Sequence, residues 1–571
     1  MSQWIASDTI PETISAKLAN YPPLLQQLLY NRGITDAATA EHFLTPQYDE
    51  HLHDPWLLSG MEAAVTRIKE ALTKNQSICI YADYDCDGIP GAVLFSDLLE
   101  TTGHTNFFTH IPHRHFDGFG LSVAAVEQIH AKYSPDLLIT IDCGIADLDA
   151  VERARSLGID VIVTDHHEPK ATLPPAVAVV NPKVGNTYPF PDLCGTAVAY
   201  KVAQGVLQST AADVPEGYEK WWLDMVGIAT IADMVPLVGE NRVLAHYGLL
   251  VLRKSRRPGL QQLLRAQKSD QRYLTEDDIG FTIGPRINAA SRMDTPEDAF
   301  QLLVTRDEGQ AGAYVSHLEK LNTQRKAAVA QITKDLHKRV EVTTELAPVL
   351  VYGNPDWRPS LVGLAANKFA EEYNRPVFLW GRDGNDLYKG SCRSGGNVSV
   401  VRLMDAAAEA FLAYGGHHVS GGFTLADSFI HTFPQRMIDA HTSLGTEAMV
   451  HEPYRVDATL TVDDLTEEFF LLQGRCAPFG LGNPKPLYLF KEVVPTSVET
   501  FGRTREHCKL RLPPSSKGVV EEAIAFFSQP EQFSVTPRAG QPVALLAHAE
   551  ESYFRGRRQR RLRLVDIIES L

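Results

Sequence analysis

The sequence predicts an α/β protein in which a parallel-sheet domain and a second α/β domain are joined by a long helix and followed by a C-terminal β-barrel. Three observations support this prediction. Short apolar runs alternate with helical patterns in the first third, residues 307–340 have the pattern of one continuous helix, and β-like segments replace helical patterns from about residue 454. A chain of 571 residues exceeds the size of a single hydrophobic core, so several domains are expected.

The first domain is predicted from buried strands and from the helices between them. The apolar runs are short and rich in isoleucine and valine, which is typical of strands in a parallel sheet. We expect strands at 77–82, 137–141 and 161–164 and helices at 92–102 and 148–157. Strands that alternate with helices predict right-handed crossover connections. This domain is expected to cover residues 51–300, after an N-terminal extension at 1–50.

The rest of the chain is predicted to form a connecting helix and two further domains. The connecting segment is placed at 301–345, where apolar residues fall on one helix face: Leu318, Leu321, Ala328, Ile332 and Leu336. A second α/β domain is expected at 346–452, beginning with the strand-like APVLVYG. An OB-like barrel is expected at 453–571, where Leu562 and Leu564 alternate with arginines as in a strand with one buried face.

Composition and charge limit the class of protein. The N-terminus lacks the basic start and apolar block of a signal peptide, and no apolar stretch approaches the roughly 20 residues that cross a bilayer. We therefore expect a cytoplasmic protein without membrane contact. The seven cysteines are scattered and form no CxxC pair, which indicates reduced thiols. A net charge of -16 does not exclude a nucleic-acid partner, because only a local basic lining is required.

Acidic and imidazole side chains directly follow each of the three expected strands. In chain order they are Asp83, Asp85 and Asp87, then Asp142, then Asp165, His166 and His167. The carboxyl ends of parallel strands meet at one edge of an open α/β sheet, which is where ligands bind. We therefore expect these side chains to form a single cluster.

The chemistry of this cluster favours a metal centre. Three aspartates at spacing two repel one another unless a cation lies between them. Carboxylates with one or two histidines suit Mn²⁺ or Mg²⁺ better than zinc. Two ions about 3.5 to 4 Å apart would need a bridging carboxylate, and would activate a water for attack on a phosphoryl group. Each motif alone could merely cap a helix and form a turn, but three successive strand ends with the same chemistry favour metal binding.

The strings YADYDCDGIPG, IDCGI, VTDHHEP and IADMVPL, in this order, resemble the four motifs of the DHH phosphoesterase superfamily. The resemblance implies five metal ligands: Asp85, Asp87, Asp142, His166 and Asp233. Asp142 would be the bridge and Asp83 a further ligand or a base. Asp165 would orient a histidine, and His167 would face the scissile phosphate. Asp233 rests on the resemblance, since its own context is that of an ordinary helix end.

Further segments distinguish among members of the superfamily. IPHRHFDGFGLS, GPRINAASRMDTPEDAF, DWRPSLVGLAANKF, GSCRSGGN, GGHHVSGGF and APFGLGNPKP resemble the RecJ family, whose members are single-strand-specific 5′ to 3′ DNA exonucleases. The resemblance implies DNA contacts by Arg114, Phe119, Arg286, Ser391 and Arg393. His417 and His418 could be a metal pair, but adjacent histidines in a flexible loop usually cannot both reach one ion, so we expect His417 to contact a phosphate. Arg114, Ser391 and Arg393 would hold the 5′ phosphate. Arg286 would contact the backbone, and Phe119 would stack on a base.

Two features of the sequence leave finer questions open. The chain departs from the usual family strings at four positions, none of them a proposed ligand: Cys143, Ser291, Arg358 and Ser360. The arginines between Arg555 and Arg563 could be a solvated strand face, although on an OB-like barrel we favour a track for a single strand.

Two other functions are considered beside the exonuclease. A small-substrate phosphatase acting on nanoRNA or phosphoadenosine phosphate predicts that residues 455–571 are dispensable. An inactive RecJ-like DNA-binding scaffold predicts damaged ligand positions, yet all of them are present. The RecJ resemblance further implies single-stranded DNA as substrate, a single-stranded-DNA-binding protein and a helicase as partners, and roles in recombination and mismatch repair. We also expect a monomer.

Overall fold

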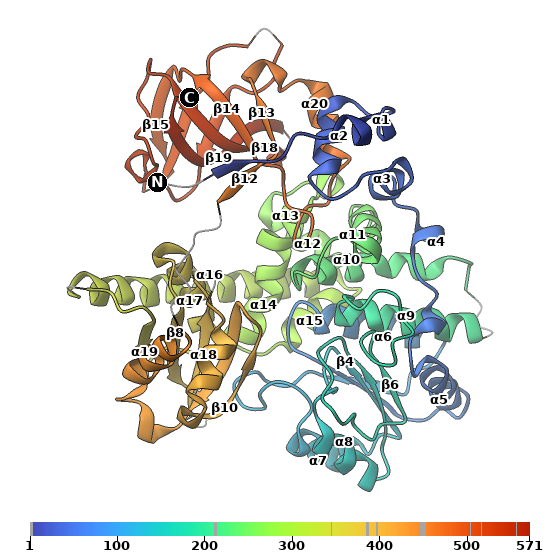
Figure 1. Ribbon diagram of the computed structural model, residues 1–571. Helices are drawn as coiled ribbons and strands as arrows, with labels where there is room; N and C mark the ends of the chain where they lie inside the picture. Colours follow the sequence, from blue (N-terminus) through green and yellow to red (C-terminus); the bar gives the residue numbers. More distant parts are fainter. Residues whose placement is uncertain are drawn as a thin grey trace.

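The computed structural model describes residues 4–210, 214–343, 345–383, 387–395, 398–445, 453–502, 504–515, 517–554 and 557–570. In Figure 1 the parallel-sheet domain lies at the lower right, the second α/β domain at the lower left and the barrel at the top. The long helix α16 (Glu308–Glu341) runs between them, as the sequence predicts. Of the helices in the described ranges, none is long and apolar enough to cross a membrane.

The sheet of the first domain has five parallel strands in the order β3-β2-β4-β5-β6. Its strands are β2 (Ile78–Ala82), β3 (Phe107–His110), β4 (Leu137–Ile141), β5 (Asp160–Thr164) and β6 (Ala178–Val180). The three predicted strands are therefore confirmed, and two more flank them. Every residue of β2 and β4 is buried, because helices cover both faces of the sheet.

The helices of this domain fall on the two faces of the sheet and beyond its edge. One face is covered by α5 (Met61–Thr73), α6 (Gly88–Thr101) and α9 (Gly195–Ser209), and the other by α7 (Val123–Tyr133) and α8 (Leu148–Ser156). The remaining helices are α10 (Leu223–Ala232), α11 (Gly239–Leu252), α12 (Pro258–Gln267), α13 (Glu276–Asp278), α14 (Gly284–Met293) and α15 (Glu297–Val304). A π-helical turn, Ile279–Ile283, joins α13 to α14.

The second α/β domain has a five-stranded sheet in the order β10-β11-β9-β8-β7, in which only β7 and β8 pair in parallel. Its elements are β7 (Leu350–Gly353), α17 (Pro359–Tyr373), β8 (Val377–Arg382), β9 (Tyr388–Arg393), α18 (Val400–Ala406), β10 (Phe411–Gly416), β11 (Ser420–Leu425) and α19 (Phe433–Ser443). Apolar residues of α16 and α17 pack together, so the long helix is part of this domain's core.

The C-terminal domain is rich in strands, as predicted. A seven-stranded sheet has the order β13-β14-β18-β19-β17-β16-β15. The elements are β12 (Tyr454–Val456), β13 (Ala458–Leu460), α20 (Glu467–Gly474), β14 (Tyr488–Val493), β15 (Ser497–Phe501), β16 (His507–Arg511), β17 (Glu522–Ala525), β18 (Val543–Phe554) and β19 (Arg557–Glu569). Leu562 and Leu564 are buried in β19, as their alternation with arginines predicts.

The arginines of β19 are engaged within the protein. Arg560 pairs with Glu467 and Glu551, and Arg558 pairs with the same two glutamates. The Arg563 guanidinium lies 4.3 Å from the centre of the Phe526 ring. These contacts do not support the expected open track for a single strand, because Arg558 and Arg560 are paired with acids and Arg563 packs on an aromatic ring. Arg555 and the side chain of Arg557 lie outside the described residues.

The N-terminal extension packs on the C-terminal barrel, which the sequence did not predict. Its elements are β1 (Trp4–Ala6), α1 (Glu12–Lys17), α2 (Pro23–Tyr30), α3 (Ala37–Leu44) and α4 (Tyr48–His51). Strand β1 pairs in parallel with β12, and Leu18, Leu25 and Leu28 share one core with the barrel strands. Figure 1 shows α1, α2 and α3 in blue beside the orange barrel, whereas Tyr48 of α4 belongs to the core of the parallel-sheet domain.

A buried ion-pair network in the parallel-sheet domain gives a test of the fold. Arg257 pairs with Asp97 on α6 and Asp224 on α10, and all three side chains are buried. Arg257→Met would leave the buried Asp224 without a cation and Asp97 with only the exposed Arg306, so we expect a loss of about 3 to 5 kcal/mol in the free energy of unfolding. The exposed Arg306, 2.7 Å from Asp97, provides the control: Arg306→Met should cost less than about 1 kcal/mol. Urea unfolding followed by fluorescence measures both, and equal losses would contradict the prediction.

Candidate active site

Three adjacent strands deliver Asp83, Asp142 and Asp165 to one edge of the sheet. Each residue directly follows its strand, and the hydrogen-bond ladder continues through them. The Asp83 N–H donates to Ile141 O (3.1 Å), and the Asp142 N–H donates to Thr164 O (3.0 Å). All three carboxylates are buried. The sequence therefore brings these acids together through strand register alone, as expected.

The loop after β2 adds two more carboxylates. Asp85 Oδ1 accepts hydrogen bonds from the N–H groups of Asp87 and Gly88, which closes the turn into α6. Asp87 directly precedes α6, and its carboxylate reaches the N-terminus of α9. There its two oxygens accept hydrogen bonds from Gly195 N (2.6 Å) and Thr196 N (2.7 Å). A helix N-terminus stabilises negative charge, so this contact fixes a carboxylate beside the others.

Glycine is required at position 195, which the sequence analysis did not single out. A Cβ at Gly195 would lie 2.5 Å from Asp142 Cβ and 2.6 Å from Asp142 Oδ1. Asp142 itself has a φ of +61°, in the left-handed region that costs an L-residue about 1 to 2 kcal/mol. The close approach of α9 and the strained backbone together aim the Asp142 carboxylate into the site.

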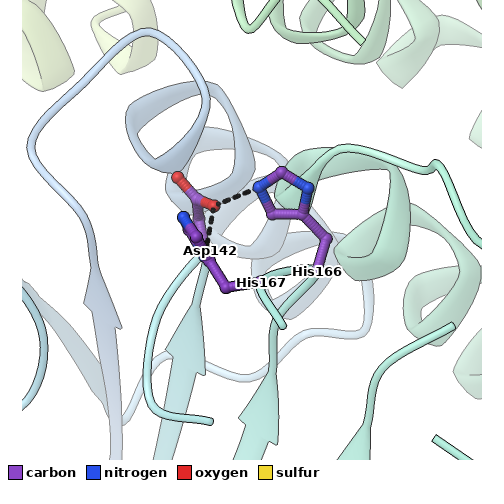
Figure 2. A group of neighbouring side chains, drawn as sticks. All are labelled: Asp142, His166 and His167. Carbon is purple, nitrogen blue, oxygen red and sulfur yellow. Dashed lines mark ion pairs between the residues drawn. The ribbon is translucent and has the colours of Figure 1, made fainter. Parts of the chain in front are cut away.

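His166 lies at the centre of the cluster. Its Nε2 is 3.2 Å from Asp142 Oδ1 and 3.8 Å from both Asp87 Oδ2 and Asp233 Oδ2. Asp233 reaches the cluster from the end of α10, so the fourth expected segment does converge with the first three. Figure 2 shows the Asp142 carboxylate facing His166 and His167.

His167 occupies the outer side of the cluster. Its Nδ1 donates to Asp165 Oδ1 (2.7 Å), and the same oxygen accepts from two backbone N–H groups. Burial opposes ionisation of Asp165, but the His167 contact outweighs burial and lowers the Asp165 pKa. Burial likewise opposes a charged His167, yet Asp165 raises its pKa overall. The pair is therefore ionic, and Asp165 fixes the orientation of the ring.

Three other carboxylates, those of Asp83, Asp142 and Asp233, resist ionisation. Burial raises the pKa of Asp83 and Asp142 well above the usual value, and neighbouring aspartates add to the rise. Burial and then Asp87 raise the pKa of Asp233 to about 9. Within the described chain, Asp83 Oδ1 and Asp142 Oδ1 are buried without a hydrogen-bond partner. Buried oxygens without donors are costly, and a cation among them removes the cost.

The donor atoms fit divalent cations. Three groups have ligand atoms within 4.8 Å of one another: Asp142, His166 and His167; Asp87, His166 and Asp233; Asp83, Asp85 and Asp142. Asp142 and His166 each belong to two groups, so ions bound to neighbouring groups would share a ligand. Mainly carboxylate donors with few histidines suit Mn²⁺ or Mg²⁺.

A cleft of about 520 Å³ lies between the catalytic domain and the second α/β domain. The first domain contributes Tyr84, Arg114 and Phe119, and the second contributes Ser360, Ser391 and Phe423. The Arg114 guanidinium stacks 4.8 Å from the centre of the Tyr84 ring. Phe119 is 59% exposed, and its ring centre lies 5.6 Å from that of His167. The cleft thus has a basic and aromatic wall that reaches the acidic cluster through the contact between Phe119 and His167.

Several arginines lie close together beside this cleft. Burial, followed by the charges of Arg114, Arg325 and Arg393, lowers the pKa of Arg292 to about 9. Arg325 Nε is buried and has no hydrogen-bond partner among the residues that the structure describes. Clustered guanidinium groups with lowered pKa values indicate a site for an anion such as phosphate. Arg292 and Arg325 were missed by the sequence analysis, because a lone arginine on a helix carries no local signal.

Two expected DNA-contacting residues lie elsewhere. Arg286 is buried on α14 and pairs with Glu319 on α16, while Nη1 donates to Thr282 O. Its guanidinium is therefore used within the protein, and the expected contact with a DNA backbone is not supported. His417 is exposed in the turn between β10 and β11, outside the residues that line the cleft.

Two departures from the family strings join the domains. Ser360 Oγ donates to Arg292 O (2.8 Å), and Arg358 Nη1 donates to Met293 O (3.1 Å). Both contacts connect the start of α17 to the end of α14. Cys143 and Ser291 are buried, and Ser291 Oγ donates to Asn288 O (3.4 Å).

Comparisons with known proteins agree with this architecture. Family models match at residues 77–230 (DHH family, N-terminal domain), 346–440 (DHHA1 domain) and 456–566 (RecJ OB domain). The single-stranded-DNA-specific exonuclease RecJ of Haemophilus influenzae is 31% identical over 593 residues, covering 100% of both chains. The RecJ of Bacillus subtilis is 31% identical over 547 residues, covering 95% of this chain and 68% of that protein.

The chain belongs to the RecJ family. Its fold matches the crystal structure of RecJ from Thermus thermophilus in complex with Mn²⁺, with a TM-score of 0.81 and 26% identity over 100% of this chain and 80% of that one. The Mg²⁺ complex of the same protein matches with a TM-score of 0.75 and 25% identity, covering 100% and 79%. As a RecJ family member with a DHH domain, the chain is a metal-dependent phosphoesterase.

The raised carboxylate pKa values predict how pH affects the metal-free protein. A carboxylate whose pKa is higher in the folded state favours folding at low pH, and this contribution is lost as pH rises toward the folded pKa. With a pKa of about 9 for Asp233 and raised values for Asp83 and Asp142, the unfolding temperature should fall between pH 6 and 9 in EDTA. Mn²⁺ should remove most of this fall, and Asp233→Asn should reduce it. A flat profile in EDTA would contradict the prediction.

Proposed function

We propose that the chain is a single-strand-specific 5′ to 3′ DNA exonuclease that releases 5′ mononucleotides by two-metal hydrolysis. The observation that carries the proposal is the contact between His167, a member of the linked cation-binding groups, and the exposed Phe119 of the cleft, with the arginines around Arg292 nearby. Acidic ligands suit the ions, arginines suit the phosphates, and an aromatic ring suits a base. The activity in the printed names of the curated RecJ relatives supports the same reaction.

The proposed ligands are Asp85, Asp87, Asp142, His166 and Asp233, with Asp142 shared between two Mn²⁺ or Mg²⁺ ions. When bound, such ions would lower the pKa of a water and stabilise the charge on the attacked phosphoryl group. Asp83 is proposed as a further ligand or a base. Asp165 orients His167 through the 2.7 Å hydrogen bond, and His167 faces the side from which the phosphate would enter.

The cleft residues are proposed to bind the end of a single strand. Arg114, Ser391 and Arg393 would hold the 5′ phosphate, and Arg292 adds a charge that the sequence analysis did not include. Phe119 would stack on the adjacent base, which every base permits through its π face. The gap between the two walls of the cleft would admit a single strand and would be too narrow for a duplex.

The remaining expectations belong to the same proposal. The domain limits at 51–300, 346–452 and 453–571 contain the three family matches, after an N-terminal extension at 1–50 and around a connecting segment at 301–345. We propose a cytoplasmic monomer that acts with a single-stranded-DNA-binding protein and a helicase in recombination and mismatch repair. An inactive scaffold is disfavoured because every proposed ligand is present and the described carboxylates converge.

Removal of the shared carboxylate tests the chemistry. Asp142→Ala takes a ligand from two of the three donor groups, so cleavage of 5′-labelled single-stranded DNA in Mn²⁺ should be lost. The assay includes duplex DNA and phosphoadenosine phosphate, each with Mn²⁺, Mg²⁺ or chelator. Near-normal nuclease activity of Asp142→Ala would refute the two-metal proposal. A wild-type preference for phosphoadenosine phosphate would favour the small-substrate phosphatase instead.

A matched pair of arginines on α14 tests the phosphate site. Arg292→Met should lower kcat/KM for 5′-phosphorylated DNA about 10- to 100-fold, because a charge-assisted hydrogen bond is worth roughly 1.5 to 3 kcal/mol. The loss should be smaller for 5′-hydroxyl DNA. Arg286→Met on the same helix should leave the ratio between the two substrates unchanged, since Arg286 pairs with Glu319. Equal ratios in both variants would remove Arg292 from the proposed site.

A further inference from the structure

The chain segment after Asp233 is held in a strained shape. Asp233 ends α10, and the next residue, Met234, has a φ of +61° and a side chain that is 69% exposed. A left-handed methionine costs about 1 to 2 kcal/mol and gains nothing from burial at this position. Such strain persists only where the surrounding structure fixes both ends of the segment. One end is α10, and the other end requires an anchor.

A loop of the C-terminal barrel supplies this anchor. The N–H of Leu237, four residues after Asp233, donates to the carbonyl of Leu481 at 2.7 Å. Two glycines permit the close approach. A Cβ at Gly480 would lie 2.8 Å from Leu237 Cδ1, and a Cβ at Gly482 would lie 3.2 Å from both Pro236 Cβ and Val238 Cγ1. The loop with the sequence APFGLGNPKP therefore packs directly against the segment that follows Asp233, a proposed metal ligand.

The loop is itself rigid. Asn483 is 1% exposed, and its Nδ2 donates to Cys476 O (2.9 Å) and Pro478 O (2.8 Å). Arg32 of the N-terminal extension donates from Nε to Asn483 Oδ1 at 2.7 Å. These bonds close the loop on itself, so it can act as a fixed support.

Arg242 ties the same loop to the catalytic domain. It lies on α11, which directly follows the Asp233 segment, and it is buried. Its guanidinium donates to the carbonyls of Cys476 (3.0 Å) and Ala477 (2.9 Å), and also to Phe43 O (2.7 Å) in the N-terminal extension. Burial lowers the Arg242 pKa to about 10. A buried guanidinium bound to a row of loop carbonyls fixes the loop position relative to α11.

A second contact runs from the loop to the other side of the site. Lys485 Nζ lies 2.8 Å from Asp277 Oδ2 on α13. The π-helical turn after α13 leads into α14, where Asn288 Oδ1 accepts the N–H of Cys86 (3.0 Å) between Asp85 and Asp87. The barrel loop therefore contacts two separate segments. One follows Asp233, and the other leads through α14 to the backbone between Asp85 and Asp87.

We propose that the barrel loop 475–485 is a positioning element of the metal centre, which holds Asp233 at ligand distance through the Leu237–Leu481 hydrogen bond and the glycines beside it. The inference rests on the proposed function only in taking Asp233 as a ligand. Without the loop, the left-handed Met234 can relax and turn the Asp233 carboxylate away from His166. The barrel thus contributes to metal affinity, in addition to any contact it makes with DNA.

Two glycines with the same backbone conformation provide the test. Gly482 has a φ of +74° and contacts the Asp233 segment, while Gly540 has a φ of +78° and nothing within 4 Å of an added Cβ. Valine at either position introduces the same backbone strain, but only Gly482→Val disturbs the segment. Titration of Mn²⁺ into the DNA-free, full-length protein should show affinity about 10- to 100-fold weaker for Gly482→Val, the range for lost support of a metal ligand. Gly540→Val should stay within about twofold of wild type, because it leaves the segment untouched.

Kinetics and folding controls complete the experiment. Excess Mn²⁺ should restore kcat of Gly482→Val with little change in KM for DNA. Circular dichroism verifies folding, and where valine prevents it the pair Gly482→Ala and Gly540→Ala repeats the comparison. Equal Mn²⁺ affinity in the two variants of a pair would overturn the inference even if the wild type is a nuclease. A wild type without nuclease activity but with the Mn²⁺ difference would instead reject the proposed function.

Discussion

Repulsion among carboxylates at one edge of the parallel sheet is the constraint on which the catalytic domain depends. Asp83, Asp142 and Asp233 all have raised pKa values, and each would prefer to be neutral in the metal-free protein. A folded chain tolerates this only because other contacts position the acids. Asp87 is fixed by two N–H groups at the start of α9, and Asp165 by His167. A divalent cation turns the repulsion into attraction, so the free energy required to hold the acids together becomes affinity for metal.

Backbone strain is the second cost of this arrangement. Asp142 and Met234 both adopt left-handed conformations, and both lie at or next to a proposed ligand. At Asp142 the strain is held by the sheet ladder and by the close approach of Gly195. At Met234 the sheet is absent, and a loop from a different domain replaces it. The two strained residues therefore differ in what supports them. Asp142 directs its own carboxylate into the cluster, whereas Met234 follows Asp233, whose carboxylate reaches the same cluster.

The sequence predicts those features that local spacing determines. Buried strands followed by acids predict the acidic cluster at one edge of the sheet, since strand register places successive strand ends together. The spacing of apolar residues predicts α16. Long-range pairing leaves no such trace. Arg286 and Arg292 lie in one motif on the same helix, yet only the structure reveals that Glu319 neutralises the first. The packing of the N-terminal helices on the barrel escaped prediction for the same reason, because their apolar faces do not specify a partner.

The position of the barrel bears on how a RecJ-family protein is built. A binding module joined by a flexible linker would leave the metal centre of the catalytic domain unchanged when removed. Here the barrel shares a core with the N-terminal helices, and its loop carbonyls receive a buried arginine from α11. Because the loop also bonds to the segment that follows Asp233, that segment is supported by the barrel as well as by its own domain. The position of a proposed metal ligand in the first domain thus depends on contacts with residues more than 200 positions later in the chain.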